Sequence, residues 1–460
     1  MRQTTHSTRA HTGVPGPKGY PLLGCLPQFW REPLSTLTNV QRQDGDVVRL
    51  DLGTLRFYLL SHPDHVKWVL QENAKNYSKG YDRVKVLLGN GLVMNEGASW
   101  LQQRRLMQPI FHQRRLEGFA VTIVDETQKM LERWEALANE GRTVNAAKEM
   151  KLLTQRIVVK TMFGAEVGAE EEKIARAFDT ALLGINARSL MPRWFGRLPI
   201  SFNRRFKRAL ATLDEEVYRI IRQRRGGRGK GDDLLAMLME TRDEETGESM
   251  SDRQLRDEVI TIYLAGHETT ANALSWAWYL LSKNPETARK TGEEVSCVLK
   301  GRLPGFEDLP TLVYTRMVID ETLRLYPPAW IVTRRAIEDD EIGGYRIPAG
   351  SRLMLSPYLT HRRPELWENP EAFEPERFAS ESTNGSQRYV YYPFGGGPRQ
   401  CIGNNFALME ATLIVSTVMQ RYRLDLIPGQ EIKAQPRSTL GPRPGVWVRL
   451  GAASPAAPQA

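Results

Sequence analysis

The chain has 460 residues, of which 41% are hydrophobic and 25% charged, as in folded globular proteins. This composition excludes disordered, collagen-like and low-complexity proteins, because the apolar content is sufficient for a large core. The 63 basic and 54 acidic side chains leave a net charge of +9, which favours an acidic partner and carries no information about the fold.

The predicted elements begin after a polar amino-terminal stretch that contains no apolar segment. We therefore expect neither a signal peptide nor a membrane anchor, and we expect a cytoplasmic protein. Residues 46–64 alternate apolar and polar side chains on both sides of a Gly53-Thr54 turn, which predicts a β-hairpin. From about residue 63 to residue 300 the apolar residues recur at helical spacing.

Short extended segments return near residues 343–355 and 445–450, and another long helix is predicted to begin after Gly403. No repeat of 20 to 50 residues is present, so solenoids and propellers are not expected. The sequence predicts a mainly α protein with small β-sheets, in a single domain over residues 1–460 with flexible tails at 1–14 and 453–460.

Two charged runs are interpreted as solvated surface. The basic run at residues 222–230 is interleaved with glycines and has no aromatic residues, so it predicts a loop and no nucleic-acid partner. The acidic run at residues 338–341 precedes two glycines and predicts a polar turn in place of a metal cluster.

The three cysteines, Cys25, Cys297 and Cys401, form no CxxC pair, which argues against a disulfide scaffold and a four-thiolate metal site. We expect Cys25 and Cys297 to be small buried core residues. A catalytic Cys401–His pair is not favoured, because the nearest histidine, His361, lies 40 residues upstream without a motif.

The surroundings of Cys401 are the most informative part of the sequence. Phe394, Gly397, Cys401 and Gly403 have the spacing FxxGxxxCxG and lead into an amphipathic helix. A Gly-rich loop allows the backbone to approach a flat ligand closely. A cysteine just ahead of a helix start feels the partial positive charge there, which favours the thiolate.

Residues 252–285 predict one long helix with Gly266 and Thr269 in its middle, where both are poor helix formers. A transmembrane helix is excluded, because His267 and Glu268 interrupt the apolar run. A zinc-protease HExxH site is also excluded, because Ala271 stands where the second histidine is required.

On these residues the chain resembles the cytochrome P-450 haem-thiolate monooxygenases, over roughly residues 15–450. The resemblance implies haem b with Cys401 as the axial thiolate, the mode of ligation that is known from this family. It also implies that Phe394 shields the sulfur, that Arg399 pairs with a haem propionate and that Gly403 belongs to the haem-binding loop.

The same resemblance implies an oxygen-activation motif at residues 265–270, in which Glu268 relays protons and Thr269 hydrogen-bonds dioxygen. Trp100 and Arg104 match a WxxxR helix that faces the haem carboxylates. Arg334 matches another arginine that pairs with a haem propionate. Because Arg335 is adjacent, the match to the family pattern could be shifted by one residue.

The pattern ExxR occurs four times, beginning at Glu216, Glu286, Glu321 and Glu374, so the pattern alone selects none of them. Only Glu321 has the downstream context of the family. We therefore assign a structural role to a triad of Glu321, Arg324 and Arg377.

The family also implies where a substrate would bind, and these positions are largely apolar, so a lipophilic molecule is expected. Fatty acids, terpenoids and steroids all remain open. Residues 191–200 occupy the position of an access lid, with ordinary loop packing as the alternative. The substrate positions are Tyr81, Val93, Ala265, Ile331, Val332 and Leu440.

Together these features predict a haem-thiolate monooxygenase that inserts one atom of O2 into a lipophilic substrate. No flavin or ferredoxin module follows residue 450, so we expect electrons from a separate ferredoxin or flavodoxin-type donor with its reductase. Two alternatives remain open, a haem-based sensor and a haem-thiolate enzyme that uses peroxide or rearranges its substrate. The intact Glu268-Thr269 pair argues against both.

Overall fold

A computed structural model describes residues 13–80, 84–111, 113–164, 168–190, 195–196, 198–226, 233–243, 247–379 and 389–452. Its contacts divide the chain into two compact units. Unit 1 comprises Met1–Gly80, Leu323–Ala372 and Ser380–Cys401, and unit 2 comprises Tyr81–Thr322, Phe373–Ala379 and Ile402–Ala460. The expected single domain stays a prediction. Both expected tails lie largely outside the described residues.

Unit 1 is built on the hairpin that the alternating pattern predicts. Strands β1 (Val47–Leu52) and β2 (Leu55–Leu60) are antiparallel, with Val48 opposite Leu59. The two strands meet at Gly53, whose φ of +64° is a conformation that glycine adopts without strain. Val48 and Leu50 are fully buried, so the apolar side of the alternation faces the core and the prediction is confirmed.

Three later segments complete this sheet in the order β1-β2-β8-β5-β3. Strand β8 (Arg352–Leu355) is parallel to β2, while β5 (Val332–Ala336) is antiparallel to β8 and β3 (Tyr77–Ser78) is antiparallel to β5. The sequence predicts the region of β8, whereas β3 and β5 are not predicted. The unit also contains α1 (Leu26–Arg31), α2 (Pro33–Asp44), α3 (Pro63–Lys67) and α14 (Pro357–Thr360).

The acidic run at residues 338–341 is not simply a polar turn, because Asp340 begins strand β6 (Asp340–Ile342), which pairs with β7 (Tyr345–Ile347). The Asp340 carboxylate accepts hydrogen bonds from Trp68 Nε1 at 3.0 Å and Asn73 Nδ2 at 2.9 Å, and also from the Tyr77 hydroxyl. Among the residues that the structure describes, no group of histidine, cysteine or acidic residues could hold a metal ion. Asp340 therefore links strand β6 to the segment at residues 68–77.

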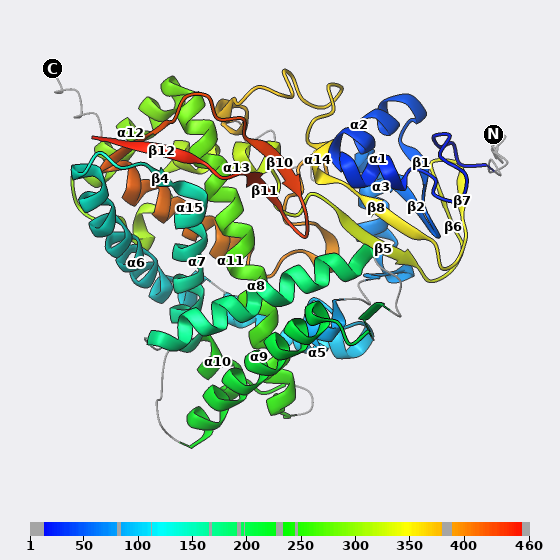
Figure 1. Cartoon of the computed structure of the whole chain (residues 1–460), viewed down its shortest axis with the longest axis horizontal. Coiled ribbons are helices and arrows are strands. Elements are labelled where there is room, and N and C mark those ends of the chain that lie inside the picture. Colours follow the sequence, from blue (N-terminus) through cyan, green and yellow to red (C-terminus); the bar gives the residue numbers. More distant parts are fainter. Residues whose placement is uncertain are drawn as a thin grey trace, which may run out of the picture. The chain divides into compact units, whose positions relative to one another are not determined.

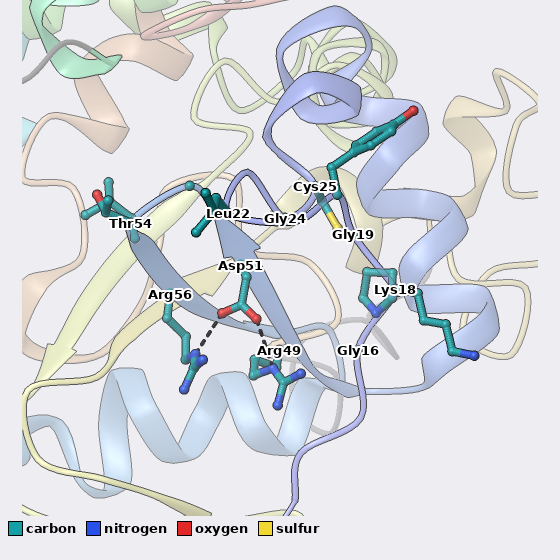
Figure 2. A pocket seen from close by; sticks show the side chains of 14 residues that line it. Gly16, Lys18, Gly19, Leu22, Gly24, Cys25, Arg49, Asp51, Thr54 and Arg56 are labelled. Carbon is teal, nitrogen blue, oxygen red and sulfur yellow. Dashed lines mark hydrogen bonds and ion pairs between the residues drawn. The ribbon is translucent and has the colours of Figure 1, made fainter.

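A pocket of about 550 Å³ lies in unit 1 between residues 16–25 and the β1–β2 hairpin (Figure 2). Asp51 lies in it between two arginines, with Arg49 Nε at 3.3 Å and Arg56 Nε at 2.7 Å. It contains none of the residues predicted to bind a cofactor or substrate.

Unit 2 is mainly helical, as predicted, and its centre is the 32-residue helix α11 (Asp252–Lys283). The hydroxyl oxygen of Ser251 caps this helix by accepting from the backbone N–H of Gln254 at 3.3 Å. Many residues of α11 are buried, because the helix packs against α7, α9 and α15. The other helices are α4 (Lys85–Leu88), α5 (Gly97–Met107), α6 (Gln113–Asn139), α7 (Ala146–Phe163), α8 (Gly168–Leu190), α9 (Ser201–Arg225), α10 (Leu234–Glu240), α12 (Pro285–Leu299), α13 (Val313–Leu325) and α15 (Asn404–Met419).

Two small sheets belong to unit 2. Strands β4 (Val144–Asn145), β12 (Trp447–Ala452) and β9 (Tyr422–Leu426) form one sheet. Strands β10 (Lys433–Pro436) and β11 (Leu440–Arg443) form a hairpin beside α11 (Figure 1). The region of β12 is predicted. The β10–β11 hairpin is not, because its prolines and glycine interrupt any apolar alternation.

Two predictions in unit 2 are wrong. Cys297 is exposed, because Val295 and Leu299 occupy the buried side of α12 and residue 297 faces away from it. The basic run begins inside α9, where Arg224 contacts Asp233 and Arg225 Nε lies 2.6 Å from Asp252 Oδ1. Its glycine-rich part, residues 227–230, lies outside the described residues. No helix of the described part of the chain is both long and apolar enough to cross a membrane.

Candidate functional site

The cysteine loop of unit 1 is held by its own backbone. The N–H of Cys401 donates to the carbonyl of Phe394 at 3.0 Å, and the N–H of Gln400 donates to the carbonyl of Gly397 at 3.1 Å. Gly397 has φ +65°, and a Cβ there would lie 1.8 Å from the carbonyl oxygen of Leu70. Residue 397 must therefore be glycine, because the backbone at Leu70 leaves no room for a side chain. From the sequence we expect the glycines of this loop to allow close approach to a flat ligand, which is a different reason.

This loop leaves the cysteine exposed and leads directly into a helix. Gly403 is the residue before α15, so Cys401 stands three residues ahead of the first helical residue, as the sequence predicts. Phe394 and Arg399 are half-buried.

Strand β5 separates the two candidate arginines of unit 1. Arg334 is buried and donates from Nη1 to the carbonyl of Thr333 at 2.9 Å, whereas Arg335 is exposed on the other side of the strand. This alternation favours Arg334 as the residue that faces inward. Ile331 and Val332, which precede it, are half-buried.

The sequence suggests His361 only as a catalytic partner of Cys401, and that pair is not favoured. In the structure His361 has a structural role. It is fully buried, its Nδ1 lies 3.3 Å from the carbonyl oxygen of Arg324, and its Nε2 accepts from the N–H of Tyr392 at 2.9 Å. Burial and the nearby Arg324 guanidinium lower the pKa of His361 well below its usual value. A neutral His361 thus connects Arg324 to the backbone two residues before Phe394.

The predicted structural triad makes two sets of contacts. In unit 2, the buried Glu321 carboxylate accepts from Arg377 Nε at 3.0 Å and from the N–H of Glu374 at 2.9 Å. In unit 1, the guanidinium of Arg324 donates to the carbonyls of His361, Pro370 and Ala372 at 2.7 to 2.9 Å. In both sets a buried polar side chain has specific hydrogen-bond partners.

In unit 2, Trp100 and Arg104 lie one turn apart on α5, where Trp100 is buried and Arg104 half-buried. Gln103, between them, is also buried and donates from Nε2 to the carbonyl of Asn90 at 2.9 Å. Helix α5 therefore supports the loop at residues 89–95 that precedes it.

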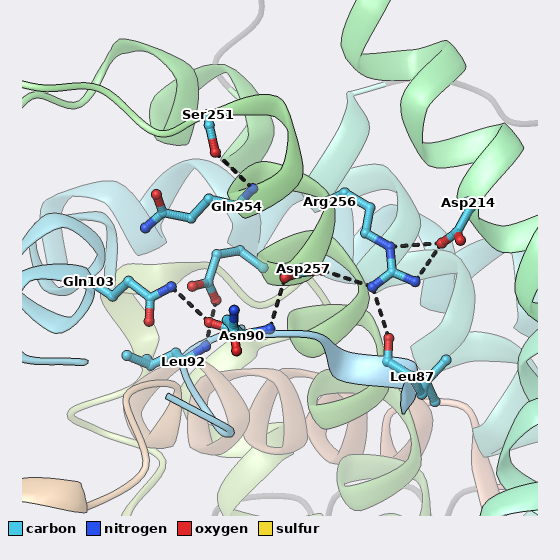
Figure 3. Close-up of polar contacts among 10 residues, drawn as sticks. Leu87, Asn90, Leu92, Gln103, Asp214, Ser251, Gln254, Arg256 and Asp257 are labelled. Carbon is cyan, nitrogen blue, oxygen red and sulfur yellow. Dashed lines mark hydrogen bonds and ion pairs between the residues drawn. The ribbon is translucent and has the colours of Figure 1, made fainter. Parts of the chain in front are cut away.

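Helix α11 holds the same loop through two buried carboxylates (Figure 3). The N–H of Asn90 donates to Asp257 Oδ2 at 2.8 Å, and the N–H of Leu92 donates to Glu258 Oε2 at 3.0 Å. The next residue, Val93, is 37% exposed. Tyr81, the other candidate in this region, and residues 191–194 and 197 of the expected lid lie outside the described residues.

The predicted oxygen-activation motif lies in the middle of α11, which continues through it as a helix. Ala265 is exposed, whereas Tyr263 and His267 on the opposite side of α11 are buried. A Cβ on Gly266 would lie 2.9 Å from Val158 Cγ2, so glycine here also permits close packing of α7. The Thr269 hydroxyl donates to the carbonyl of Ala265 at 2.6 Å.

The two titratable residues of the motif have different environments. Burial lowers the pKa of His267 to about 4, and its Nδ1 lies 2.8 Å from the carbonyl oxygen of Tyr263, so His267 is a neutral structural residue. Burial raises the pKa of Glu268, although its Oε1 accepts from the Thr439 hydroxyl at 2.8 Å. Of these two residues, Glu268 is therefore the one whose protonated form is favoured by burial. Leu440, next to Thr439, is fully buried.

The residues of each unit are chemically suited to a haem. Unit 1 supplies an exposed thiol at Cys401 and the arginines Arg334 and Arg399 for carboxylates. Unit 2 supplies Trp100 and Arg104 as donors, and Ala265 is an exposed small residue in the middle of α11. These donor sets match the thiolate and propionate partners that a haem requires.

Comparison with known proteins gives an independent result. The family model described as Cytochrome P450 matches residues 14–447. "Cyclooctatin synthase" of Streptomyces melanosporofaciens is 38% identical, with 94% of this chain and 93% of the relative covered. "Cyclooctat-9-en-7-ol 5-monooxygenase" of the same organism is also 38% identical, with 92% and 91% covered. "Pentalenene oxygenase" of Streptomyces avermitilis is 34% identical, with 97% and 99% covered.

Proposed function

The chain belongs to the cytochrome P450 family, and from this premise we propose that Cys401 is the axial ligand of haem b in a monooxygenase that oxidises a terpenoid. The enzyme is a P450 monooxygenase, and its family implies a haem iron with cysteine thiolate ligation. When bound, the haem supplies the reduction of dioxygen and the insertion of one oxygen atom. The exposed Cys401 thiol at the end of a fixed loop is the observation that carries the assignment.

Terpenoids are favoured over fatty acids and steroids by the relatives. Monooxygenases that act on terpenoids are 34% and 38% identical over more than nine-tenths of the chain. The apolar side chains of Val93, Ile331 and Val332, all at least partly accessible, suit a hydrocarbon without charged groups. Leu440 is fully buried, so we assign it a role in shaping the site.

The polar residues divide between cofactor binding and proton supply. Trp100, Arg104, Arg334 and Arg399 hold the two haem carboxylates by hydrogen bonds and charge. Glu268, whose pKa is raised by burial, relays protons, and Thr269 presents its hydroxyl one residue further along the helix.

Replacing Glu268 with glutamine or Thr269 with alanine is expected to preserve haem content and substrate binding while it lowers product formation. Proton delivery by a positioned group is worth about 10² to 10⁴ in rate, so the loss should appear in turnover and in product formed per electron. The measurement is electron consumption and product yield with a cyclic terpene. Glu286→Gln, on the exposed side of α12, is the control, and wild-type yield in both test variants would refute the proton role.

P450 monooxygenases generally receive electrons from a redox partner. We propose a ferredoxin or flavodoxin-type donor that docks on basic residues, including Arg105, which is 44% exposed and lies 3.7 Å from Asp243. The side chains of Arg114 and Arg115 and all of Arg388 lie outside the described residues. The cytoplasmic location stays a prediction.

Electron transfer from an acidic donor should slow as salt is added, because the screening length falls from about 10 Å at 0.1 M to 3 Å at 1 M. The measurement is the rate of haem reduction by the donor across this range, for wild type and for Arg105→Glu combined with Arg115→Glu. The double charge reversal should slow reduction at low salt. Rates that respond neither to salt nor to charge reversal would reject basic docking.

A further inference from the structure

Three residues of α11 at successive helical turns form hydrogen bonds with Thr439 and Leu440, where strand β11 begins. The hydroxyl of Thr439 donates to Glu268 Oε1 at 2.8 Å, and Asn272 Nδ2 donates to the Thr439 hydroxyl oxygen at 2.9 Å. Trp276 Nε1 donates to the carbonyl of Leu440 at 3.0 Å. Glu268, Asn272 and Trp276 are spaced by four residues, so they form one stripe along the helix.

The hairpin fits closely against this stripe. A Cβ on Gly441 would lie 2.8 Å from Asn272 Oδ1, so any larger residue would displace the asparagine or the strand. Leu440 and Trp276 are both almost fully buried. The hairpin is therefore placed at one position along α11 and has little freedom to slide.

The Thr439 hydroxyl takes part in two hydrogen bonds, one with Asn272 and one with Glu268, and the chemistry of Asn272 determines the direction of both. The amide nitrogen of Asn272 can only donate, so the Thr439 oxygen accepts from it and the single Thr439 O–H is left for the Glu268 carboxyl. Asn272 thereby orients the hydroxyl, and the hydroxyl in turn orients the acid.

This arrangement determines where the carboxyl of Glu268 lies relative to the rest of the motif. Ala265 and Thr269 share a second stripe, joined by the bond from the Thr269 hydroxyl to the Ala265 carbonyl. Successive residues of a helix are rotated by about 100°, so the stripe of Glu268 and that of Thr269 are neighbours. The contact with Thr439 holds the Glu268 side chain beside the stripe of Ala265 and Thr269, on the side of α11 that faces the hairpin.

We propose that Thr439 is a positioning residue for Glu268, through which the hairpin that carries Leu440 sets the orientation of the Glu268 carboxyl group. The inference rests on the proposed function of Glu268. Thr439 contacts neither substrate nor cofactor in this proposal and acts only through the carboxyl. Substitutions in the hairpin should then alter proton supply as well as substrate binding.

Thr439→Val removes the hydroxyl and keeps the shape, whereas Thr439→Ser keeps the hydroxyl. We expect the valine variant to lower product formed per electron about fivefold, the usual effect of losing one hydrogen bond, and the serine variant to restore it. The Thr439 hydrogen bond favours the Glu268 carboxylate, so its loss should move the pH midpoint of coupling upward. Asn272→Ala, which frees the hydroxyl to turn away, should change both readouts in the same direction and serves if the valine variant does not fold.

The variant Glu268→Gln separates this inference from the proposed function. If Glu268→Gln alone leaves coupling and its pH dependence unchanged, the proton role of Glu268 fails. If Glu268→Gln impairs coupling, the inference predicts that adding Thr439→Val causes no further loss. Wild-type coupling in Thr439→Val, or an equal additional loss in the double variant, would overturn the positioning role of Thr439.

Discussion

Replacing Glu321 with alanine is expected to lower the free energy of unfolding by about 3 to 5 kcal/mol, the usual cost of breaking a buried ion pair. The fully buried carboxylate accepts from Arg377 Nε and from the N–H of Glu374, and alanine would leave both donors without this acceptor. Glu321→Gln should cost less, because an amide oxygen can still accept one of these bonds. Denaturant unfolding of the haem-loaded enzyme measures the difference.

The sequence provides a matched control in Glu286, which begins another ExxR pattern. Glu286 pairs with Arg289 at 2.6 Å on the surface of α12, where both side chains are at least half-exposed. An exposed ion pair contributes little, so Glu286→Ala should leave the unfolding midpoint almost unchanged. Equal effects of the two substitutions would show that the burial of Glu321 has no special role.

Glu410→Gln is expected to stabilise the protein at pH 8 and to lose this advantage near pH 4.5. Burial in α15 raises the pKa of Glu410 to about 8, although a hydrogen bond from Thr270 acts in the other direction. Among the described residues its Oε2 atom has no hydrogen-bond partner. Because the folded form keeps its proton when the unfolded form has released it, wild-type stability falls as the pH rises from about 4.5 to about 8.

A shift of this size corresponds to about 3 to 5 kcal/mol between the two pH values, and glutamine removes it because an amide does not titrate. The measurement is the difference in thermal midpoint between Glu410→Gln and wild type from pH 4.5 to pH 8. A difference that does not change with pH would contradict a buried, protonated Glu410.

Glu126→Gln is a control for Glu410→Gln, because the pKa of Glu126 is shifted in the opposite direction. Burial disfavours the Glu126 carboxylate, but Lys160 at 2.7 Å and Lys129 at 2.9 Å outweigh it and lower its pKa. A lowered pKa stabilises the folded state above the unfolded pKa, and this contribution is lost as the pH falls through the folded value. Glu126→Gln should therefore destabilise the enzyme most at neutral pH.

Local patterns in the sequence predicted the elements that carry their own periodicity. The β1–β2 hairpin followed from the alternation around Gly53, and α11 followed from its helical spacing despite Gly266 and Thr269 in its middle. The cysteine loop was equally local, because its spacing lies within ten residues. Each of these depends on neighbours in the chain, which a sequence contains directly.

Contacts between distant segments were not predictable in this way. Thr439 lies 171 residues from Glu268, in a hairpin without an apolar pattern, and only the folded structure brings the two together. Asn272 could have been found, because a polar residue four positions after Glu268 lies on the same side of the helix. Cys297 was predicted as buried from residue type alone, although the apolar spacing of Val295 and Leu299 already indicated the opposite side of α12.

The proposed ligation of the haem iron by the Cys401 thiolate is tested by the spectrum of the reduced enzyme with carbon monoxide. We expect the red-shifted band typical of thiolate ligation in wild type, in Cys25→Ser and in Cys297→Ser, and its loss in Cys401→Ser. A spectrum typical of histidine ligation in freshly prepared, folded wild type, or a thiolate band that survives in Cys401→Ser, would contradict the assignment.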